Sequence, residues 1–157
     1  MYFCPKLENM KIELHEGIED VKFGLNQEQI QGLWGEPDEI EEIEDEEGSI
    51  TVWHYDEREA SLSFDPLFEN KLSGIAISSD DVTLQGEKIM GKGESEVLDL
   101  LDTFGLDDIE GEELEEGESV FFSLKSGITL FFDNNELLEV KLSPDFNDET
   151  ETVIWPS

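Results

Sequence analysis

Residues 27–80 read QEQIQGLWGEPDEIEEIEDEEGSITVWHYDEREASLSFDPLFENKLSGIAISSD, and residues 94–145 read ESEVLDLLDTFGLDDIEGEELEEGESVFFSLKSGITLFFDNNELLEVKLSPD. The two stretches share one order of features: a short helix-like pattern, a run of acidic residues, and three short segments rich in β-branched and aromatic residues. Self-similarity of this kind indicates a repeated structural unit. The sequence therefore predicts two tandem copies of one motif.

Each copy begins with a helix signal. Three apolar residues recur at the spacing i, i+3, i+4, which places them on one face of a helix. Gly35 and Gly105 follow at the position where helices commonly end, and Pro37 reinforces the first stop. The apolar positions are Ile30, Leu33 and Trp34 in the first copy and Val97, Leu100 and Leu101 in the second.

Strand signals follow in both copies, as short β-branched or aromatic segments bounded by Gly, Asp, Asn or charge. The acidic run after each helix is expected to add a further strand. We therefore expect an α+β fold of two tandem repeats. Each repeat is a helix plus a three- or four-stranded antiparallel meander, and together they form a sheet with helices packed on one face. The matched segments are 50–55 with 119–124, 61–65 with 128–133, and 71–78 with 136–143.

The repeats leave two terminal segments. Residues 1–23 form an N-terminal segment in which the alternation over residues 11–15 predicts an edge strand. Repeat 1 spans residues 24–80 and repeat 2 spans residues 81–145. The tail, residues 146–157, contains the apolar run 152–155, which is expected to pack as a last strand or against another molecule.

The alternation of apolar residues predicts which side chains face the helices. Matching the two copies pairs Trp53 with Phe122 on the helix-packed face, and leaves Phe121, Phe131 and His54 on the open face. Two interpretations of the exposed aromatic residues stand side by side. They form a contact patch for a partner, or the faces are assigned wrongly or the tail covers them. The further residues expected on the packed face are Leu62, Phe64, Ile75, Ile77, Leu130, Phe132, Val140 and Leu142.

The charge balance restricts the class of partner. The chain has 42 Asp and Glu residues against 9 Lys and Arg, for a formal net charge of −33. Phosphate recognition requires Lys and Arg, so this composition excludes direct binding to nucleic acid. A charged partner should be basic, and we expect a basic protein. The alternative is that the acidity is a generic feature that serves solubility or adaptation to salt.

Signals for chemistry are absent from the sequence. It contains no nucleophile elbow, complete dinucleotide fingerprint, P-loop or H-E-x-x-H motif, and its two histidines, His15 and His54, lie far apart. Cys4 is the only cysteine. We therefore expect a chain that is not an enzyme, with no catalytic residues, cofactor or metal site. It shows neither a signal peptide nor a membrane-spanning run, which predicts a soluble cytoplasmic protein without a membrane partner.

The duplicated acidic runs are the most specific polar feature. Nine of the twelve residues from 36 to 47 are acidic, and so are eight of the twelve from 107 to 118. Should one sheet continue through both copies, the two runs would lie along the same side of it and steer a basic partner. The alternative is that each run is a solvated hairpin. The partner-binding residues expected here are Glu36, Asp38, Glu39, Glu41, Glu42 and Glu44 in the first run, and Asp107, Asp108, Glu110, Glu112 and Glu113 in the second. The expected contact residues on the open face are Phe121, Phe131 and His54.

The first copy resembles a known repeat. Its helix ends in Gly35-Glu36-Pro37, and its strands carry Trp53-His54-Tyr55 and Phe64. This pattern is similar to the tandem αβ repeat of the β-lactamase inhibitor proteins and of the small outer-membrane assembly lipoproteins. The second copy lacks the proline. The resemblance implies a curved sheet that grips another protein, and an inhibitor or assembly role without catalysis.

These observations predict a protein-binding module that captures a basic protein through an acidic surface, as a bacterial inhibitor or immunity protein does. Two alternatives stay open. One is a nucleic-acid mimic, whose carboxylates imitate phosphates and occupy a DNA- or RNA-binding site. The other is a housekeeping domain without an assignable role. The sequence does not define the oligomeric state.

Overall fold

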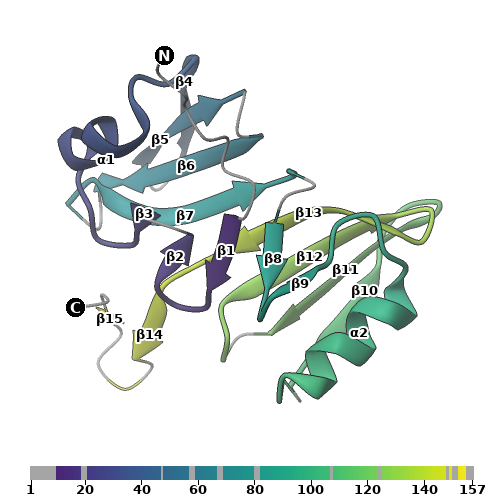
Figure 1. Cartoon of the computed structure of the whole chain (residues 1–157). Helices are drawn as coiled ribbons and strands as arrows, with labels where there is room; N and C mark the ends of the chain where they lie inside the picture. Colours follow the sequence, from purple (N-terminus) through teal and green to yellow (C-terminus); the bar gives the residue numbers. More distant parts are fainter. Residues whose placement is uncertain are drawn as a thin grey trace, which may run out of the picture.

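The computed structural model describes residues 10–18, 21–46, 48–56, 59–66, 69–79, 82–106, 108–123, 125–147, 149 and 152–154. Strands make up 52% of the structure and helices 15%. The expectation of an α+β fold, in which repeated helices and one sheet make up the structure, is therefore wrong. The fold is mostly β and is built from two large sheets, to which two short helices are added (Figure 1).

The larger sheet has eight strands and is antiparallel throughout. Its order is β10-β11-β12-β13-β7-β6-β5-β4, so two four-stranded meanders join through the pair β7–β13. The outermost strands are β4 and β10, which the acidic runs form. The strands are β4 (Glu39–Asp45), β5 (Gly48–Tyr55), β6 (Ala60–Asp65), β7 (Lys71–Ile77), β10 (Glu110–Glu113), β11 (Glu118–Ser123), β12 (Ile128–Asp133) and β13 (Glu136–Leu142).

The second sheet comes from the N-terminal segment and from the linker between the meanders. Its order is β3-β2-β1-β8-β9, with β1 and β8 parallel. Because β1 lies between β2 and β8, the expected edge strand over residues 11–15 is an interior strand of a different sheet. The strands are β1 (Met10–Glu13), β2 (Gly17–Ile18), β3 (Val21–Lys22), β8 (Val82–Leu84) and β9 (Glu87–Lys88).

The tail forms a small sheet of its own. Strand β14 (Asp145–Asn147) pairs antiparallel with β15 (Thr152–Ile154). The strand expected over residues 152–155 is therefore present for its first three residues, and Trp155 lies outside the described residues.

The two helices are held by polar contacts at their first turns. Asn26 caps α1 (Gln27–Trp34), because its Oδ1 accepts from the Gln29 N–H at 2.8 Å while Gln29 Oε1 accepts from the Asn26 N–H at 2.9 Å. In α2 (Glu94–Thr103) the cap residue is Gly93, which offers no side chain. Instead, the Glu94 N–H donates to Asn135 Oδ1 of the β12–β13 turn at 2.9 Å. The turn of the sheet therefore supplies the cap of α2.

Both helices and the five-stranded sheet share one core with a single face of the eight-stranded sheet. The core combines Ile30 of α1, Leu101 of α2 and Leu84 of β8 with Leu62 and Phe64 of β6. All eight further residues expected on the packed face are buried, which confirms that part of the pattern. The helices and the second sheet thus cover one face of the larger sheet and leave the other face open (Figure 1).

Phe122, which was expected on the core face, lies on the open face of the sheet. Directly opposed residues of neighbouring strands share a face, and the register pairs Trp53 with Leu62 but Phe121 with Leu130. Phe121, not Phe122, is therefore the counterpart of Trp53. Its ring contacts the core residue Phe132 edge-on, with centroids 5.6 Å apart. A slip of one residue in matching the copies exchanges the two faces.

Gly111 explains why Phe121 points inward. It lies opposite Phe121 in β10, where an added Cβ would approach the Phe121 Cε2 atom to 2.3 Å. Real Cβ atoms do not come that close to a ring. The absence of a side chain at Gly111 therefore gives the Phe121 ring room to cross β10.

Candidate protein-binding face

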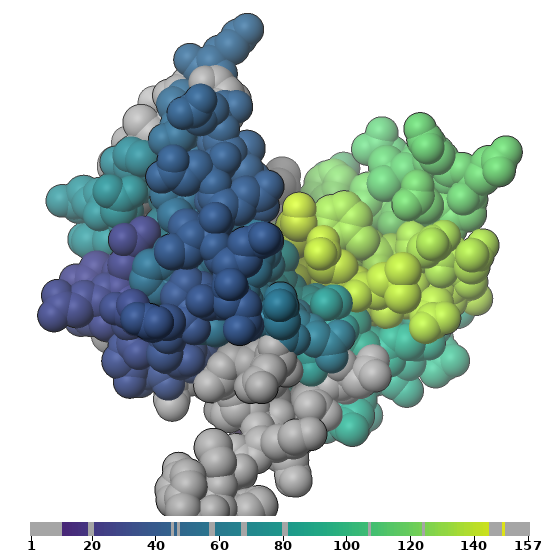
Figure 2. All heavy atoms as spheres, turned by 90° about the horizontal axis from the view of Figure 1, so that it is seen from above, coloured from purple at the N-terminus to yellow at the C-terminus, as the bar shows by residue number. Residues whose placement is uncertain are grey.

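The open face of the eight-stranded sheet carries a different set of side chains from the core face. Figure 2 shows the surface hollowed between the first meander, in blue, and the second, in green and yellow. In the first meander the register places acidic, apolar and imidazole side chains of β4 and β5 and small side chains of β6 and β7 on the open face. These are Glu39, Glu41 and Ile43 of β4, Val52 and His54 of β5, Ser61 and Ser63 of β6, and Gly74 and Ala76 of β7. The open face continues with Glu139 and Lys141 of β13, Thr129 and Phe131 of β12, Val120 and Phe122 of β11, and Glu110 and Glu112 of β10.

The first meander contributes small side chains to this face. Ser61 and Ser63 of β6 lie beside Ala76 and Gly74 of β7. A cavity of about 270 Å³ lies here, and its lining includes Ser61, Ala76, His54 and Glu139. Glu139 comes from β13, so the cavity reaches across the junction of the two meanders.

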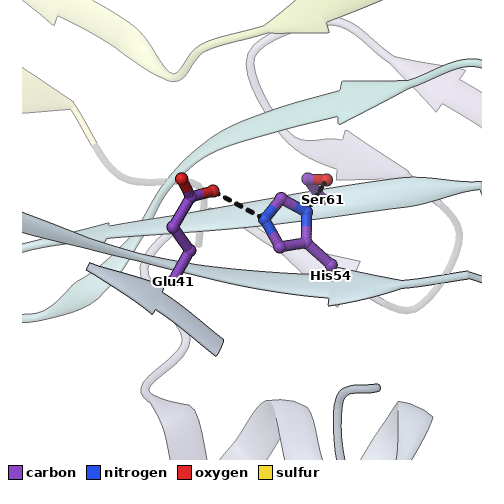
Figure 3. Close-up of polar contacts among 3 residues, drawn as sticks. All are labelled: Glu41, His54 and Ser61. Carbon is purple, nitrogen blue, oxygen red and sulfur yellow. Dashed lines mark hydrogen bonds and ion pairs between the residues drawn. The ribbon is translucent and has the colours of Figure 1, made fainter. Parts of the chain in front are cut away.

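His54 links three strands across this face (Figure 3). Its Nδ1 lies 2.7 Å from Ser61 Oγ, and its Nε2 lies 2.9 Å from Glu41 Oε1. Figure 3 shows the imidazole between the two partners, so that β4 and β6 are connected through β5. The contact therefore fixes the orientation of the Glu41 carboxylate on the open face.

A serine, a histidine and a carboxylate are also the residue types of a hydrolytic triad, which requires N–H donors for the developing oxyanion. Ser61 lies within β6 and is paired with β5 on one side and β7 on the other. The main-chain N–H groups around it serve these ladders and do not form a free pair. We interpret the three residues as an arrangement that positions Glu41.

The second meander contributes aromatic side chains. Phe131 and Phe122 are half-buried on the open face. The Lys141 ammonium lies 5.1 Å from the centroid of the Phe131 ring, as in a cation–π contact. Glu139 lies directly opposite Phe131 on β13. This half of the face therefore holds a ring that already accepts a cation.

The expected contact residues are divided between the two faces. Phe131 and His54 lie on the open face as expected, whereas Phe121 lies on the core face and is removed from the candidate site. The alternation of apolar residues in β12 correctly predicts that Phe131 lies on the open face. In β11 two phenylalanines are adjacent, so the sequence does not indicate which of them points to the core. Phe122, Glu139 and Lys141 belong to the face and were missed.

The two acidic runs lie at opposite edges of the sheet, as β4 and β10. The expectation that they lie along the same side is wrong, because the antiparallel pair β7–β13 turns the second meander around. Of the predicted acidic residues, Glu39, Glu41, Glu110 and Glu112 face the open side, and Glu42, Glu44 and Glu113 face the core side. Glu36 and Asp38 precede β4 and are exposed, and Asp107 lies outside the described residues.

Two of the predicted acidic residues have structural contacts instead. Asp38 Oδ2 accepts from the Asp56 N–H at 2.7 Å, beside the end of β5. Asp108 accepts from the Ser123 hydroxyl at 2.6 Å and from the Lys125 N–H at 3.2 Å. The Ser123 hydrogen bond is the main cause that holds the pKa of Asp108 below its ordinary value, against the opposing effect of desolvation, and the Lys125 N–H adds to it.

The lowered pKa of Asp108 predicts a pH-dependent contribution to stability. The folded state binds this proton less tightly than the unfolded state, so the carboxylate stabilises the fold above the unfolded pKa of about 4 and loses that effect as the pH falls through the folded pKa. The substitution Asp108→Asn should lower the urea midpoint at pH 7, and the difference from the wild type should shrink below about pH 4. Urea titrations at both pH values, with Glu116→Gln as the exposed control, measure this. A difference of equal size at both pH values would contradict the assignment.

Two further properties concern the helices and the acidic side chains of the described residues. Neither α1 nor α2, the helices in this part of the chain, is long and apolar enough to cross a membrane. Over the same residues, no group of three or more His, Cys, Asp or Glu side chains is arranged to hold a metal ion.

Comparisons with known proteins give a fold and no family. No protein-family model and no curated protein matches the chain. The uncharacterized protein YfeY of Escherichia coli is similar in structure, with 11% identity, a TM-score of 0.51, and coverage of 86% of this chain and 99% of that chain. At this identity the likeness concerns the fold alone.

A second structure is an extracellular protein containing an SCP domain from Bacillus anthracis. It has 18% identity and a TM-score of 0.49, and the match covers 85% of this chain and 49% of that protein, so the chain spans about half of its length. Neither comparison tests the resemblance of the first copy to the β-lactamase inhibitor proteins and the outer-membrane assembly lipoproteins. The resemblance to those repeats stays a prediction.

Proposed function

We propose that this protein is a non-enzymatic binding module that captures a basic protein on the open face of its eight-stranded sheet, as an inhibitor or immunity protein would. The hollow between the meanders receives part of the partner. Phe131 and Phe122 provide apolar contact area, since binding energy concentrates in a few anchors, aromatic ones above all. The carboxylates at both edges and in the floor attract the partner's positive charge.

The observation that carries this proposal is the distribution of charge around the aromatic residues. Glu39 and Glu41 lie at one edge of the face, Glu110 and Glu112 at the other, and Glu139 in between. Among the described residues of this face the register places two lysines: Lys71 lies opposite Asp65 at the end of β6, and Lys141 lies over Phe131. A face with aromatic side chains between acidic edges is complementary to a basic surface with apolar side chains at its centre.

Removing charge from one face at a time tests the proposal. The variant Glu39→Gln/Glu112→Gln removes one charge per edge on the open side, and Glu44→Gln/Glu113→Gln removes the same number from the same strands on the core side. We expect the open-side variant to slow association with the partner by roughly three- to tenfold at low salt and to flatten its dependence on ionic strength. The core-side variant should change the rate less.

Stopped-flow association at several salt concentrations measures both variants, with the protein retained from cell lysate as the partner. Because the net charge of the two variants is equal, a difference between them reports position and not total charge. Identical rates for the two variants would refute the placement of the binding surface on the open face.

A further inference from the structure

The edge formed by β4 differs from the rest of the sheet because its main chain is paired on one side only. Within the described residues, all seven positions of β4 pair with β5, from Glu39 opposite His54 to Asp45 opposite Gly48, and no strand lies beyond it. An edge strand presents a row of N–H and C=O groups that can pair with another strand. β4 therefore offers a main-chain binding surface along its whole length.

The side chains of β4 favour one kind of strand over others. Ile40 is 58% exposed and Ile43 is 47% exposed, and they point to opposite faces because they are three residues apart. Acidic side chains occupy all other positions of the strand. A second copy of β4 would bring carboxylates opposite carboxylates, which is destabilising. A strand that combines Lys or Arg with apolar residues would instead pair with both kinds of side chain.

The other edge lacks these features. β10 has four residues, EGEE, none of them apolar apart from a glycine that the Phe121 ring crosses. It therefore offers fewer main-chain groups and no apolar side chain to a partner strand. The two acidic edges are not equivalent, although they occupy matching places in the two meanders.

From these observations we propose that the basic partner contributes an extended segment that adds to β4 as a ninth strand of the sheet. This inference rests on the proposed function in that the partner is basic, and it specifies how the partner is held. Main-chain hydrogen bonds supply affinity in strand addition, and alternating side chains supply specificity. The added strand would extend the open face beside Glu39 and Glu41, next to the hollow that receives the rest of the partner.

Two synthetic peptides of equal charge test this mode of binding. In the first, lysine and valine alternate over a length that spans β4. The second has the same sequence but is N-methylated at every residue, which removes the N–H donors from both edges of the strand. We expect the first peptide to bind and to slow amide hydrogen exchange over residues 39–45, and the methylated peptide to bind at least about tenfold more weakly.

Two variants provide the matched control. Ile43→Ser should weaken binding of the first peptide, whereas Leu114→Ser, at a residue 49% exposed beyond β10, should not. Equal affinity of the two peptides, or protection of β10 in place of β4, would overturn strand addition while leaving capture of a basic partner intact. Failure of both peptides to bind at low salt would count against strand addition and against the proposed function together.

Discussion

Replacing Phe132 by alanine is expected to lower the free energy of unfolding by about 3–5 kcal/mol. The Phe132 side chain is 2% exposed, lies on the core face of β12, and packs edge-on against Phe121. Truncation removes the buried ring and leaves a cavity between the sheet and the elements that cover it. Urea unfolding followed by circular dichroism measures the loss.

The neighbouring residue is the control for this prediction. Phe131 has the same side chain, lies in the same strand and points to the open face, where Lys141 covers its ring. The substitution Phe131→Ala should cost about 1 kcal/mol or less, because it removes a partly exposed ring and one cation–π contact. Equal losses for the two variants would mean that the faces of β12 are assigned wrongly.

The same Phe131→Ala variant should reduce affinity for the basic partner by roughly 30-fold or more, which corresponds to about 2 kcal/mol. Phe131 lies opposite Val120 of β11 and Glu139 of β13 on the open face, where a partner's side chain would exclude water from its ring. The Lys141 ammonium lies over the electron-rich face of this ring, and a partner lysine or arginine that displaces Lys141 would make the same kind of contact. Isothermal titration calorimetry with the captured partner measures the change.

An exposed leucine outside the open face serves as the control for binding. Leu33 of α1 is 44% exposed, and α1 covers the opposite face of the sheet. Leu33→Ala should leave the affinity unchanged within about twofold, since residues outside an interface contribute little to binding. If Leu33→Ala and Phe131→Ala weaken binding equally, the open face is not the binding surface.

The strands of the larger sheet were predictable because each is long enough to show its pattern. β5, β6 and β7 lie where the first copy predicts them, and β11, β12 and β13 where the second does. The second sheet was not predicted, because it consists of strands of two to four residues, such as Gly17–Ile18 and Val82–Leu84. Such short segments do not establish a period, and their pairing joins residues distant in the chain. The expected fold class was wrong for this reason.

The candidate site was predictable only in part, and its errors have two physical causes. Phe121 and Phe122 are identical and adjacent, so local sequence could not decide which one points inward; the decisive residue is Gly111, on another strand. The positions of the two acidic runs depend on the β7–β13 pairing, which no local pattern encodes. Sequence identified the residue types of the site, and long-range register determined their faces.

Capture from native lysate followed by carbodiimide coupling tests directly whether a basic protein binds the open face. The reagent joins carboxylates to lysine amines without a spacer, so each cross-link identifies a glutamate in contact with the partner. We predict that one basic protein is retained at stoichiometric level, is released by salt, and is cross-linked to Glu39, Glu112 or Glu139. Retention of no specific protein would contradict the proposed binding surface. So would cross-links confined to Glu94, Glu96 and Asp102 of α2, the helix that covers the core face of the sheet.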